Sequence, residues 1–376
     1  MINKAEKIIL VNRLDTKIKL WSQELIKEDC KLIQWKSLSW LALFMFKRYL
    51  LDLQPCKNEN KAERNKIYII YRYLNNSENI FKSLIFSLRE IISIFTVRIF
   101  GGRVIWICHN LDRESVDRFR IISCFRRWVM AKFSHKILVT DPLLLKYAPL
   151  YLGRVVIKKL DWTCFGSINS YGADKKYGAK TNDMVKNHVI RFYEHHIAVA
   201  NDLGKKPIIG LCLGRPGRKY LHFDFAFKLI KASEATDFHL GLIVALNANQ
   251  LKIENQRQSL ENIRNSDKVL FFNEEIGFDE SDMRRYYDFT WRINNDWSVP
   301  ITTYICASNK TPILTQSYGF LPELVTVYKL GAVLDTDFAN IQHCLDVIYS
   351  DSLSPDSSFL NDRGWYTGAK RLIRDL

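Results

Sequence analysis

The chain has 376 residues, which is too long for one small hydrophobic core and suits two domains. Hydrophobic residues make up 47% of it and aromatic residues 13%, so a wholly disordered chain is excluded. The formal net charge of +15 is uneven: residues 1–150 hold 27 Lys and Arg against 14 Asp and Glu, whereas the remaining residues hold 28 against 26. A basic first part predicts an anionic partner, which could be nucleic acid, an acidic membrane surface, or a phosphorylated or acidic substrate.

The cysteines and the apolar runs indicate in which cellular compartment the protein works. The eight cysteines are scattered without a C-x-x-C pair, which favours a reducing compartment over a disulfide framework or a zinc site. The first apolar run, at residues 8–11, is too short for a secretory signal. The longest run, Leu38 to Phe46, is shorter than the roughly 20 residues that span a bilayer, and predicts either a buried helix or a helix lying in the membrane interface. We therefore expect a cytoplasmic protein. If residues 38–46 form a helix in the membrane interface, the protein would lie at the inner face of the plasma membrane.

The first half of the chain predicts an α/β unit. Strand-like runs occupy residues 7–11, 67–73, 104–108 and 136–140. Helical spacing dominates from about Leu20 to Leu53. Further helices are predicted from residue 78 to about 93, capped by Ser77 or Glu78, and from residue 118 to 132. The helix at 78–93 carries its apolar side chains on one face: Phe81, Leu84, Ile85, Leu88 and Ile92.

The second half alternates between strands and helices after the least periodic segment, residues 151–206. We interpret residues 160–206 of it as an interdomain crossover with a helix at 182–200. Strands are predicted at 208–213, 239–245, 268–272, 311–315 and 331–335. Helices are predicted at 223–232, 248–264, 280–289, 300–308, 319–328 and 337–350. This order predicts a doubly wound parallel sheet, and hence an α/β chain of two Rossmann-like domains facing a cleft. We expect the domains at 1–180 and 205–355, and a final helix in 356–376 that could cross back to the first domain.

A basic loop follows the strand at 208–213, at the end of a strand where a parallel sheet places its ligands. Arg215, Arg218 and Lys219 lie within five residues of one another in a loop with two glycines, and could clamp a diphosphate. The alternative is a surface turn with solvated charges.

A second candidate is the start of the helix at 300–308. Pro300 suits a first helical turn, so the N–H groups of residues 301–303 could point at phosphate oxygens, helped by the hydroxyls of Thr302 and Thr303. The alternative is an ordinary N-cap by Ser298.

Three further segments after predicted strands carry polar side chains. Gln316 and Ser317 open the turn that follows the strand at 311–315. Asn273 follows the strand at 268–272 and could touch a base or a ribose. The segment after the strand at 104–108 brings together a histidine and two carboxylates, which suit general-base work on an acceptor hydroxyl: His109, Asp112 and Glu114. The alternative is a structural loop histidine followed by acids at a helix N-terminus.

The order of these pieces resembles a known family. Residues 104–114 read Val-Ile-Trp-Ile-Cys-His-Asn-Leu-x-x-Glu, and residues 208–219 read Ile-Ile-Gly-Leu-Cys-Leu-Gly-Arg-x-x-x-Lys. Residues 307–325 are similar to an ending of the form A-x-G-x-P-V-I … G-x-x-P-E-x-V. Together they resemble the GT-B-fold nucleotide-sugar glycosyltransferases. The resemblance implies that the second domain binds a UDP- or GDP-sugar, held by Arg215 and Lys219 with Arg218 nearby, and that the first domain binds the acceptor, with His109 beside the sugar.

One departure from the family bears on the mechanism. Retaining members carry two glutamates with seven residues between them, just before the A-x-G-x-P motif, and residues 297–307 hold no glutamate. The chain is therefore more similar to divergent bacterial envelope-polysaccharide enzymes, several of which invert. An inverting reaction needs one base to deprotonate the acceptor, and we expect Asp112 first, then Glu114, then His109. We expect metal-independent turnover without a cofactor.

The resemblance implies a glycosyltransferase that acts on a saccharide acceptor, lipid-linked, in bacterial surface polysaccharide synthesis. Such an acceptor lies on an anionic membrane leaflet, which would explain the basic first domain. The expected docking face combines the helix at 40–46 with four arginines: Arg118, Arg120, Arg126 and Arg127. The rivals are a nucleic-acid-binding α/β protein, a nucleotide-sugar epimerase of the same fold, and a degenerate fold that has lost catalysis. No nucleic-acid-binding motif is present, and we expect no nucleic-acid partner.

Overall fold

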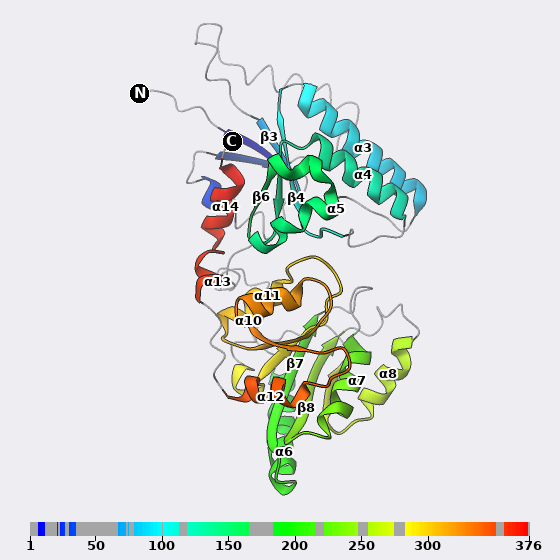
Figure 1. Cartoon of the computed structure of the whole chain (residues 1–376), viewed down its shortest axis with the longest axis vertical. Helices are drawn as coiled ribbons and strands as arrows, with labels where there is room; N and C mark the ends of the chain where they lie inside the picture. Colours follow the sequence, from blue (N-terminus) through cyan, green and yellow to red (C-terminus); the bar gives the residue numbers. More distant parts are fainter. Residues whose placement is uncertain are drawn as a thin grey trace. The chain divides into compact units, whose positions relative to one another are not determined.

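The computed structural model describes residues 7–11, 21, 23–26, 30–34, 67–72, 74, 79–99, 101–112, 119–164, 183–214, 222–246, 255–273, 283–350 and 357–374. The chain divides into two compact units (Figure 1). Unit 1 comprises Met1–Gly166 and Arg363–Leu376, and unit 2 comprises Ser167–Asp362. Each unit is an α/β structure built on a parallel sheet.

Unit 1 contains a six-stranded parallel sheet in the order β2-β1-β3-β4-β5-β6. Its strands are β1 (Lys7–Val11), β2 (Cys30–Gln34), β3 (Ile67–Tyr71), β4 (Arg103–Cys108), β5 (Lys136–Val139) and β6 (Leu160–Trp162). Residues 104–108 of β4 are all buried, as expected of a central parallel strand that is covered on both faces.

Two long helices lie side by side in unit 1 (Figure 1): α3 (Ile80–Ile99) and α4 (Arg120–Phe133). The N-terminus of α3 is capped by Asn79, whose Oδ1 accepts a hydrogen bond from the N–H of Phe81 at 2.9 Å, whereas the expected caps Ser77 and Glu78 lie outside the described residues. Short helical turns complete this part of the unit: η1 (Pro142–Lys146), α5 (Ala148–Leu152) and η2 (Arg154–Lys159).

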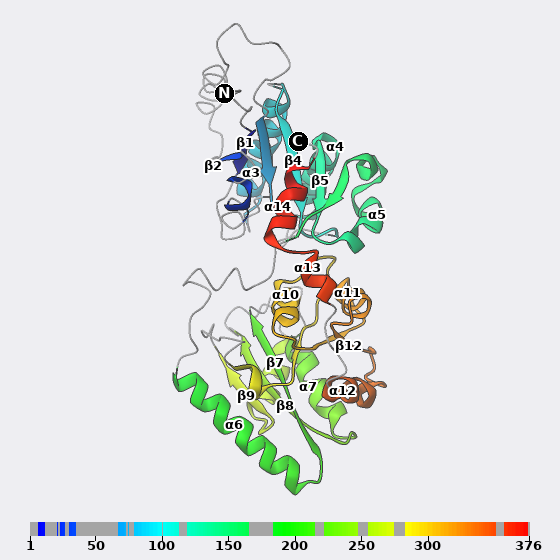
Figure 2. The ribbon, with the colours of Figure 1, turned by 90° about the vertical axis from the view of Figure 1, so that its left-hand side faces the viewer.

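The end of the chain belongs to unit 1. A buried ion pair joins Arg363 Nη2 to Asp141 Oδ2 at 2.9 Å, directly after β5. The helix α14 (Trp365–Ile373) then lies along the sheet (Figures 1 and 2), where Lys136 Nζ donates to the carbonyl oxygens of Arg371 and Arg374 at 2.9 and 2.8 Å. In each of these contacts the two residues are more than 200 positions apart in the sequence, so only the folded chain brings them together.

Unit 2 contains a six-stranded parallel sheet in the order β12-β11-β10-β7-β8-β9. Its strands are β7 (Lys206–Gly214), β8 (Phe238–Leu246), β9 (Val269–Phe272), β10 (Phe289–Trp291), β11 (Ile313–Gln316) and β12 (Gly331–Leu334). Numbered within the unit, this is the Rossmann order 3-2-1-4-5-6 read from β9 to β12.

Helices cover both faces of this second sheet (Figure 2). One face packs against α6 (Asp183–Asp202), through residues such as Ile209 and Leu211 of β7. The alternate residues Ile208 and Cys212 face a larger core on the other side. The remaining helices are α7 (His222–Ser233), α8 (Asn255–Arg264), η5 (Arg284–Tyr286), α10 (Ile301–Ser308), α11 (Leu321–Val327), α12 (Ile341–Tyr349) and α13 (Ser357–Asn361).

Three expectations are wrong in the described residues. Residues 30–34, placed within a helical stretch, form strand β2 because they pair in parallel with β1. The three-residue strand β6 falls in what we interpreted as irregular crossover. The helix expected at 280–289 is replaced by the turn η5 and, from Phe289, by strand β10. Short strands of three to five residues carry too little periodicity to be told from helices.

Candidate functional site

The strand order of unit 2 reverses between β7 and β10, which marks where an open parallel sheet binds its ligand. The two strands pair closely, with Phe289 opposite Gly210 and Thr290 opposite Leu211. Gly210 makes this approach possible, because a Cβ on it would lie 2.5 Å from the Phe289 ring. The carboxyl ends of β7 and β10 are therefore the first place to look for a site.

Arg292 is a cation that the structure describes at this edge of the sheet. It follows β10 directly. Burial raises the pKa of the Cys212 thiol, near the end of β7, to about 12. The positive charge of Arg292 acts on this pKa in the opposite direction, so the two residues interact electrostatically. The basic loop that we expected to bind a diphosphate, Arg215 to Lys219, follows Gly214 at the end of β7 and lies outside the described residues.

Arg292 is held in place by side chains from its own loop and from α10. Its Nη1 donates to Thr302 Oγ1 at 2.7 Å, and its Nε donates to Asn294 Oδ1 at 3.2 Å. Within the described part of the chain, the buried amide nitrogen Nδ2 of Asn294 and the buried hydroxyl of Thr303 have no hydrogen-bond partner. Buried polar atoms without a partner are costly, so these two groups are candidates for ligand contacts.

The loops after β10 and β11 meet at the same edge. The Phe320 N–H donates to the Asp296 carbonyl oxygen at 3.1 Å, and Ser298 Oγ donates to Asp296 Oδ2 at 3.0 Å. Gly319 has a φ of +67°, and a Cβ there would lie 2.6 Å from the Asp296 carbonyl oxygen and 2.7 Å from that of Asn294. Only glycine fits this close approach, which fixes the position of residues 294–296.

The structure places Thr302 in contact with Arg292 and Ser298 in contact with Asp296, and Thr303 follows Thr302 in α10. The roles of Ser298 and Thr303 differ from the expected ones. Ser298 is not the N-cap, because it donates to Asp296, and Pro300 occupies that position. The N–H of Thr303 donates to the Pro300 carbonyl oxygen at 3.1 Å, so it does not point at a ligand.

The other expected donor-binding residues lie apart from this group. Gln316 Nε2 donates to the carbonyl oxygens of Asp335 and Thr336 at 3.0 and 3.1 Å, which ties the end of β11 to the end of β12. Ser317 Oγ donates to the Leu334 carbonyl oxygen at 3.3 Å. Asn273 is exposed after the edge strand β9, three strands from β10, or about 14 Å at the usual strand spacing.

In unit 1, His109 and Asp112 follow the central strand β4. Arg72 Nε, at the end of the neighbouring strand β3, donates to His109 Nε2 at 3.4 Å, so that nitrogen accepts a bond and does not carry the proton. Arg127 of α4 positions the loop by donating to the Leu111 carbonyl oxygen at 2.6 Å and to that of Asn110 at 3.0 Å. Glu114 lies outside the described residues.

Asp112 is half-buried in this loop beside Tyr151 of α5. Burial raises the pKa of the Tyr151 hydroxyl, and the negative charge of Asp112 raises it further. Asp112 therefore remains the better candidate for a base, because the guanidinium of Arg72 already occupies a ring nitrogen of His109.

The expected docking face is wrong for two of its arginines. Arg126 is buried and its Nη1 lies 3.4 Å from Glu90 Oε2, and Arg127 is buried against the loop after β4. Arg120 is exposed, whereas residues 40–46 and Arg118 lie outside the described residues. No helix in the described part of the chain is both long and apolar enough to cross a membrane.

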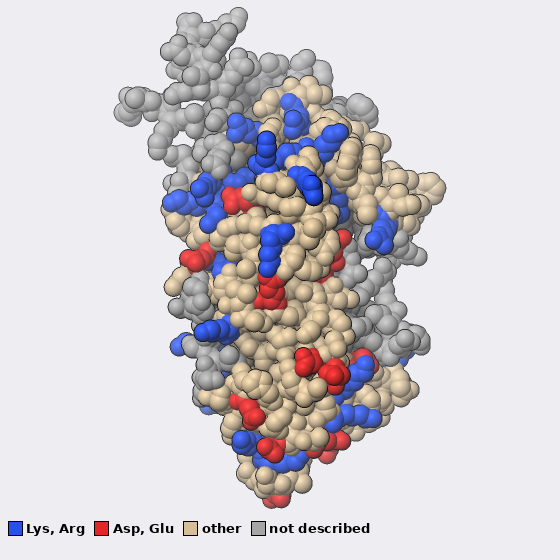
Figure 3. Space-filling model, in the orientation of Figure 1, with Lys and Arg blue, Asp and Glu red and all other residues tan. Residues whose placement is uncertain are grey.

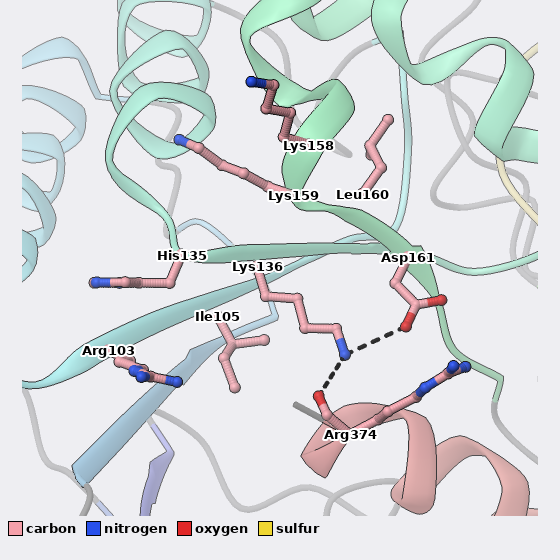
Figure 4. Close-up of a pocket in the computed structure, with 9 residues that line it drawn as sticks. All are labelled: Arg103, Ile105, His135, Lys136, Lys158, Lys159, Leu160, Asp161 and Arg374. Carbon is pink, nitrogen blue, oxygen red and sulfur yellow. Dashed lines mark hydrogen bonds and ion pairs between the residues drawn. The ribbon is translucent and has the colours of Figure 1, made fainter. Parts of the chain in front are cut away.

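A cationic pocket of about 620 Å³ lies at the amino ends of β4, β5 and β6 (Figure 4), opposite to the edge where a parallel sheet binds ligands. Its lining residues are Arg103, Ile105, His135, Lys136, Lys158, Lys159, Leu160, Asp161 and Arg374. Lys136 lies 3.2 Å from Asp161, and Lys159 Nζ donates to the Lys132 carbonyl oxygen at 2.7 Å. Burial, with three neighbouring cations, lowers the pKa of His135 to about 4. Several of these cations are therefore used in contacts that join secondary-structure elements of unit 1.

Comparisons with solved structures show where this architecture occurs. HepE from Anabaena, solved with UDP, has a TM-score of 0.60 and 12% identity, covering 98% of each chain. A trehalose-6-phosphate synthase studied for glycosyltransfer with retention has a TM-score of 0.56 and 9% identity, again over 98% of each chain. The UDP-GlcNAc 2-epimerase of Methanocaldococcus jannaschii has a TM-score of 0.52 and 11% identity over 98% of each chain. No family model matches the chain, and no curated protein matches it.

The chain has the GT-B fold. The expected fold class, two parallel-sheet Rossmann-like units, is thereby confirmed. The names of the neighbours include a sugar-transferring synthase and an epimerase, so the GT-B fold by itself does not choose between these reactions.

Sequence reasoning missed three residues of the unit 2 site: Arg292, Asn294 and Asp296. They were interpreted as part of a loop because strand β10, which places them at the switch point, was not predicted. The pattern Arg-Ile-Asn-Asn-Asp after a buried Phe-Thr-Trp was the available signal. Among the described residues, no three His, Cys, Asp or Glu side chains lie together so that they could hold a metal ion.

Proposed function

We propose that this protein is a glycosyltransferase that moves a sugar from a UDP- or GDP-sugar to a hydroxyl group of a saccharide acceptor. Unit 2 binds the nucleotide part of the donor, and unit 1 binds the acceptor and supplies the base. The observation that carries the proposal is the group formed by Arg292, Asn294 and Thr302 at the switch point of the unit 2 sheet.

Arg292 and the start of α10 suit a diphosphate. A guanidinium makes charge-assisted hydrogen bonds to phosphate, and the N-terminus of a helix favours a negative charge. Arg215, Arg218 and Lys219, directly after β7, add further cations from the sequence. UDP in the HepE structure and sugar transfer in the trehalose-6-phosphate synthase are consistent with this role.

In the proposed reaction, the oxygen of the acceptor hydroxyl forms a bond to the anomeric carbon of the donor sugar. At the same time, the carboxylate of Asp112 accepts the proton of that hydroxyl. The bond from that carbon to the diphosphate oxygen breaks, and the nucleoside diphosphate leaves with its negative charge stabilised by cations and helix N–H groups. One displacement inverts the configuration at the anomeric carbon. We propose a lipid-linked acceptor of bacterial surface polysaccharide synthesis, in accord with the basic charge of residues 1–150.

The donor site is tested by isothermal titration calorimetry with UDP and GDP. Arg292→Gln should weaken binding of the preferred nucleotide by about tenfold or more, because it removes one charge-assisted contact. The matched control is Arg284→Gln, since Arg284 precedes the same strand β10 at its amino end and donates to the Tyr287 carbonyl oxygen. Equal losses in both variants would contradict the assignment of the site.

The reaction is tested by incubating the protein with a panel of UDP- and GDP-sugars and saccharide acceptors. Acceptor-dependent release of the nucleoside diphosphate, with the configuration of the product read by NMR, supports an inverting transferase. Retained configuration would contradict the single displacement by Asp112. Epimerised sugar formed without an acceptor would identify the epimerase alternative, which the Methanocaldococcus neighbour makes worth testing.

A further inference from the structure

The long helix α3 of unit 1 has its polar and apolar faces reversed. Its buried side chains include Ser83, Ser87, Glu90, Ser93 and Thr96, which face the sheet and α4. Large apolar side chains lie on its exposed face: Ile80, Phe81, Leu84, Ile85, Leu88, Phe95 and Ile99. Phe81 is 72% exposed, although a surface helix of a globular protein normally turns such residues towards the core.

The buried polar groups of α3 have partners, which allows this reversed orientation. Arg126 of α4 forms an ion pair with Glu90, with Nη1 and Oε2 3.4 Å apart. Three hydroxyls donate to main-chain carbonyl oxygens one turn earlier in α3, at 2.8, 2.7 and 2.8 Å: Ser87, Ser93 and Thr96. The inward face therefore combines partnered polar groups with the buried apolar side chains of Ile94 and Val97, and the outward face carries the larger number of apolar side chains.

The apolar exposure continues over the elements next to α3. Helix α4 packs against α3, α5 and η2, and it exposes Ile121, Phe125 and Trp128 at helical spacing. Ile121 is 87% exposed. The elements α5 and η2 add Leu150, Tyr151, Val155 and Ile157. We call the exposed side chains of α3, α4, α5 and η2 the helical face; an apolar surface of this extent marks an interaction site.

The charge of the helical face has one sign. Its exposed cations are Lys82, Arg89, Arg98, Arg120, Lys132, Lys146, Arg154 and Lys158. Glu90 is the one carboxylate in residues 80–99, 120–133 and 142–159, and it is buried against Arg126. Figure 3 shows blue Lys and Arg atoms spread over the visible surface of unit 1, with a few red Asp and Glu atoms among them. Apolar side chains among cations, with no exposed carboxylate on the described residues of these four elements, complement a surface that is apolar below and anionic above.

We propose that the helical face of unit 1 docks on an anionic lipid bilayer, with the apolar side chains of α3 and α4 inserted among the acyl chains and the cations at the head groups. The long side chains of Lys and Arg can reach the head-group level from an apolar surface. Trp128, whose ring lies 4.9 Å from Lys132 Nζ, suits the boundary between the two layers. The proposal rests on unit 1 alone and does not depend on the reaction proposed above.

The test is co-sedimentation of the full chain with vesicles of phosphatidylcholine, or of equal parts phosphatidylcholine and phosphatidylglycerol. We expect binding to the anionic vesicles that is weakened by salt. Leu88→Glu should reduce it by about tenfold or more, because burial of one leucine is lost. The matched control is Leu203→Glu in unit 2, since Leu203 is 58% exposed and Leu88 is 59% exposed; this variant should bind like the unaltered chain.

A second pair of variants tests the charge. Lys132→Glu should weaken binding to the anionic vesicles, whereas Lys231→Glu, on α7 of unit 2 and likewise placed over an aromatic ring, should not. Absence of vesicle binding would overturn the proposal, as would equal losses in the Leu203 control. If Leu88→Glu instead dissociates a dimer in analytical ultracentrifugation, or lowers the unfolding midpoint without any vesicle binding in the unaltered chain, the face is covered by protein and the proposal is wrong.

Discussion

Gly319 offers a sharp test of the proposed donor site. It joins the loop after β11 to residues 294–296 after β10, and its φ is +67°. A Cβ in Gly319→Ala would lie 2.6 Å from the Asp296 carbonyl oxygen and 2.9 Å from the Asp296 nitrogen. Both are backbone atoms, so they can give way only if the whole loop moves.

The size of the effect follows from two costs. A left-handed conformation costs alanine about 1 kcal/mol more than glycine. Forcing a methyl group into a filled space typically costs a further 1–3 kcal/mol or so. The matched control is Gly204→Ala in the same unit, because Gly204 has a φ of +64° and a Cβ there would meet nothing within 4 Å. The control should therefore show the first cost alone.

Two measurements separate these costs. Urea unfolding should show a loss of about 1 kcal/mol for Gly204→Ala and about 2–4 kcal/mol for Gly319→Ala. Calorimetry with UDP or GDP should show about tenfold weaker binding for Gly319→Ala alone, because Asn294 and Arg292 move with the loop. Equal destabilisation of the two variants, or unchanged nucleotide affinity in Gly319→Ala, would refute the reasoning.

Three further predictions concern single groups. Asp112→Asn should lower transfer by about 100-fold or more while leaving nucleotide affinity unchanged, as measured by turnover and calorimetry; transfer at the normal rate would contradict its role as base. His196, buried on α6 with its Nε2 2.8 Å from the His239 carbonyl oxygen, has a pKa lowered by burial from 6.5 to about 4, so the unfolded chain binds a proton that the folded chain does not. The free energy of unfolding should therefore be highest above pH 6.5 and fall by up to about 3 kcal/mol towards pH 4. In His196→Gln, the free energy of unfolding should change less with pH over this range. Arg126→Met should cost about 3–5 kcal/mol in urea unfolding, because Glu90 is left buried without its ion-pair partner, and Arg126→Met combined with Glu90→Leu should recover much of it.

The overall architecture could be predicted from the chain because its strands are apolar and its helices follow them in regular alternation. Runs such as 104–108 and 208–212 are buried on both sides, so their composition alone marks them as parallel strands. The candidate site was predicted only in part: Thr302 contacts Arg292, whereas Gln316 joins β11 to β12.

The local sequence thus determined the α/β class, the strand ends at which we propose that ligands bind, and the excess of positive charge in the first half. Tertiary structure decided what a short or amphipathic segment becomes. Phe289-Thr-Trp291 is a strand because β7 and β11 flank it, and that pairing places Arg292 at the switch point. The apolar face of α3 points outwards because Arg126 neutralises Glu90 on the inner face. Both outcomes depend on contacts between residues distant in the chain, which periodicity within one segment does not contain.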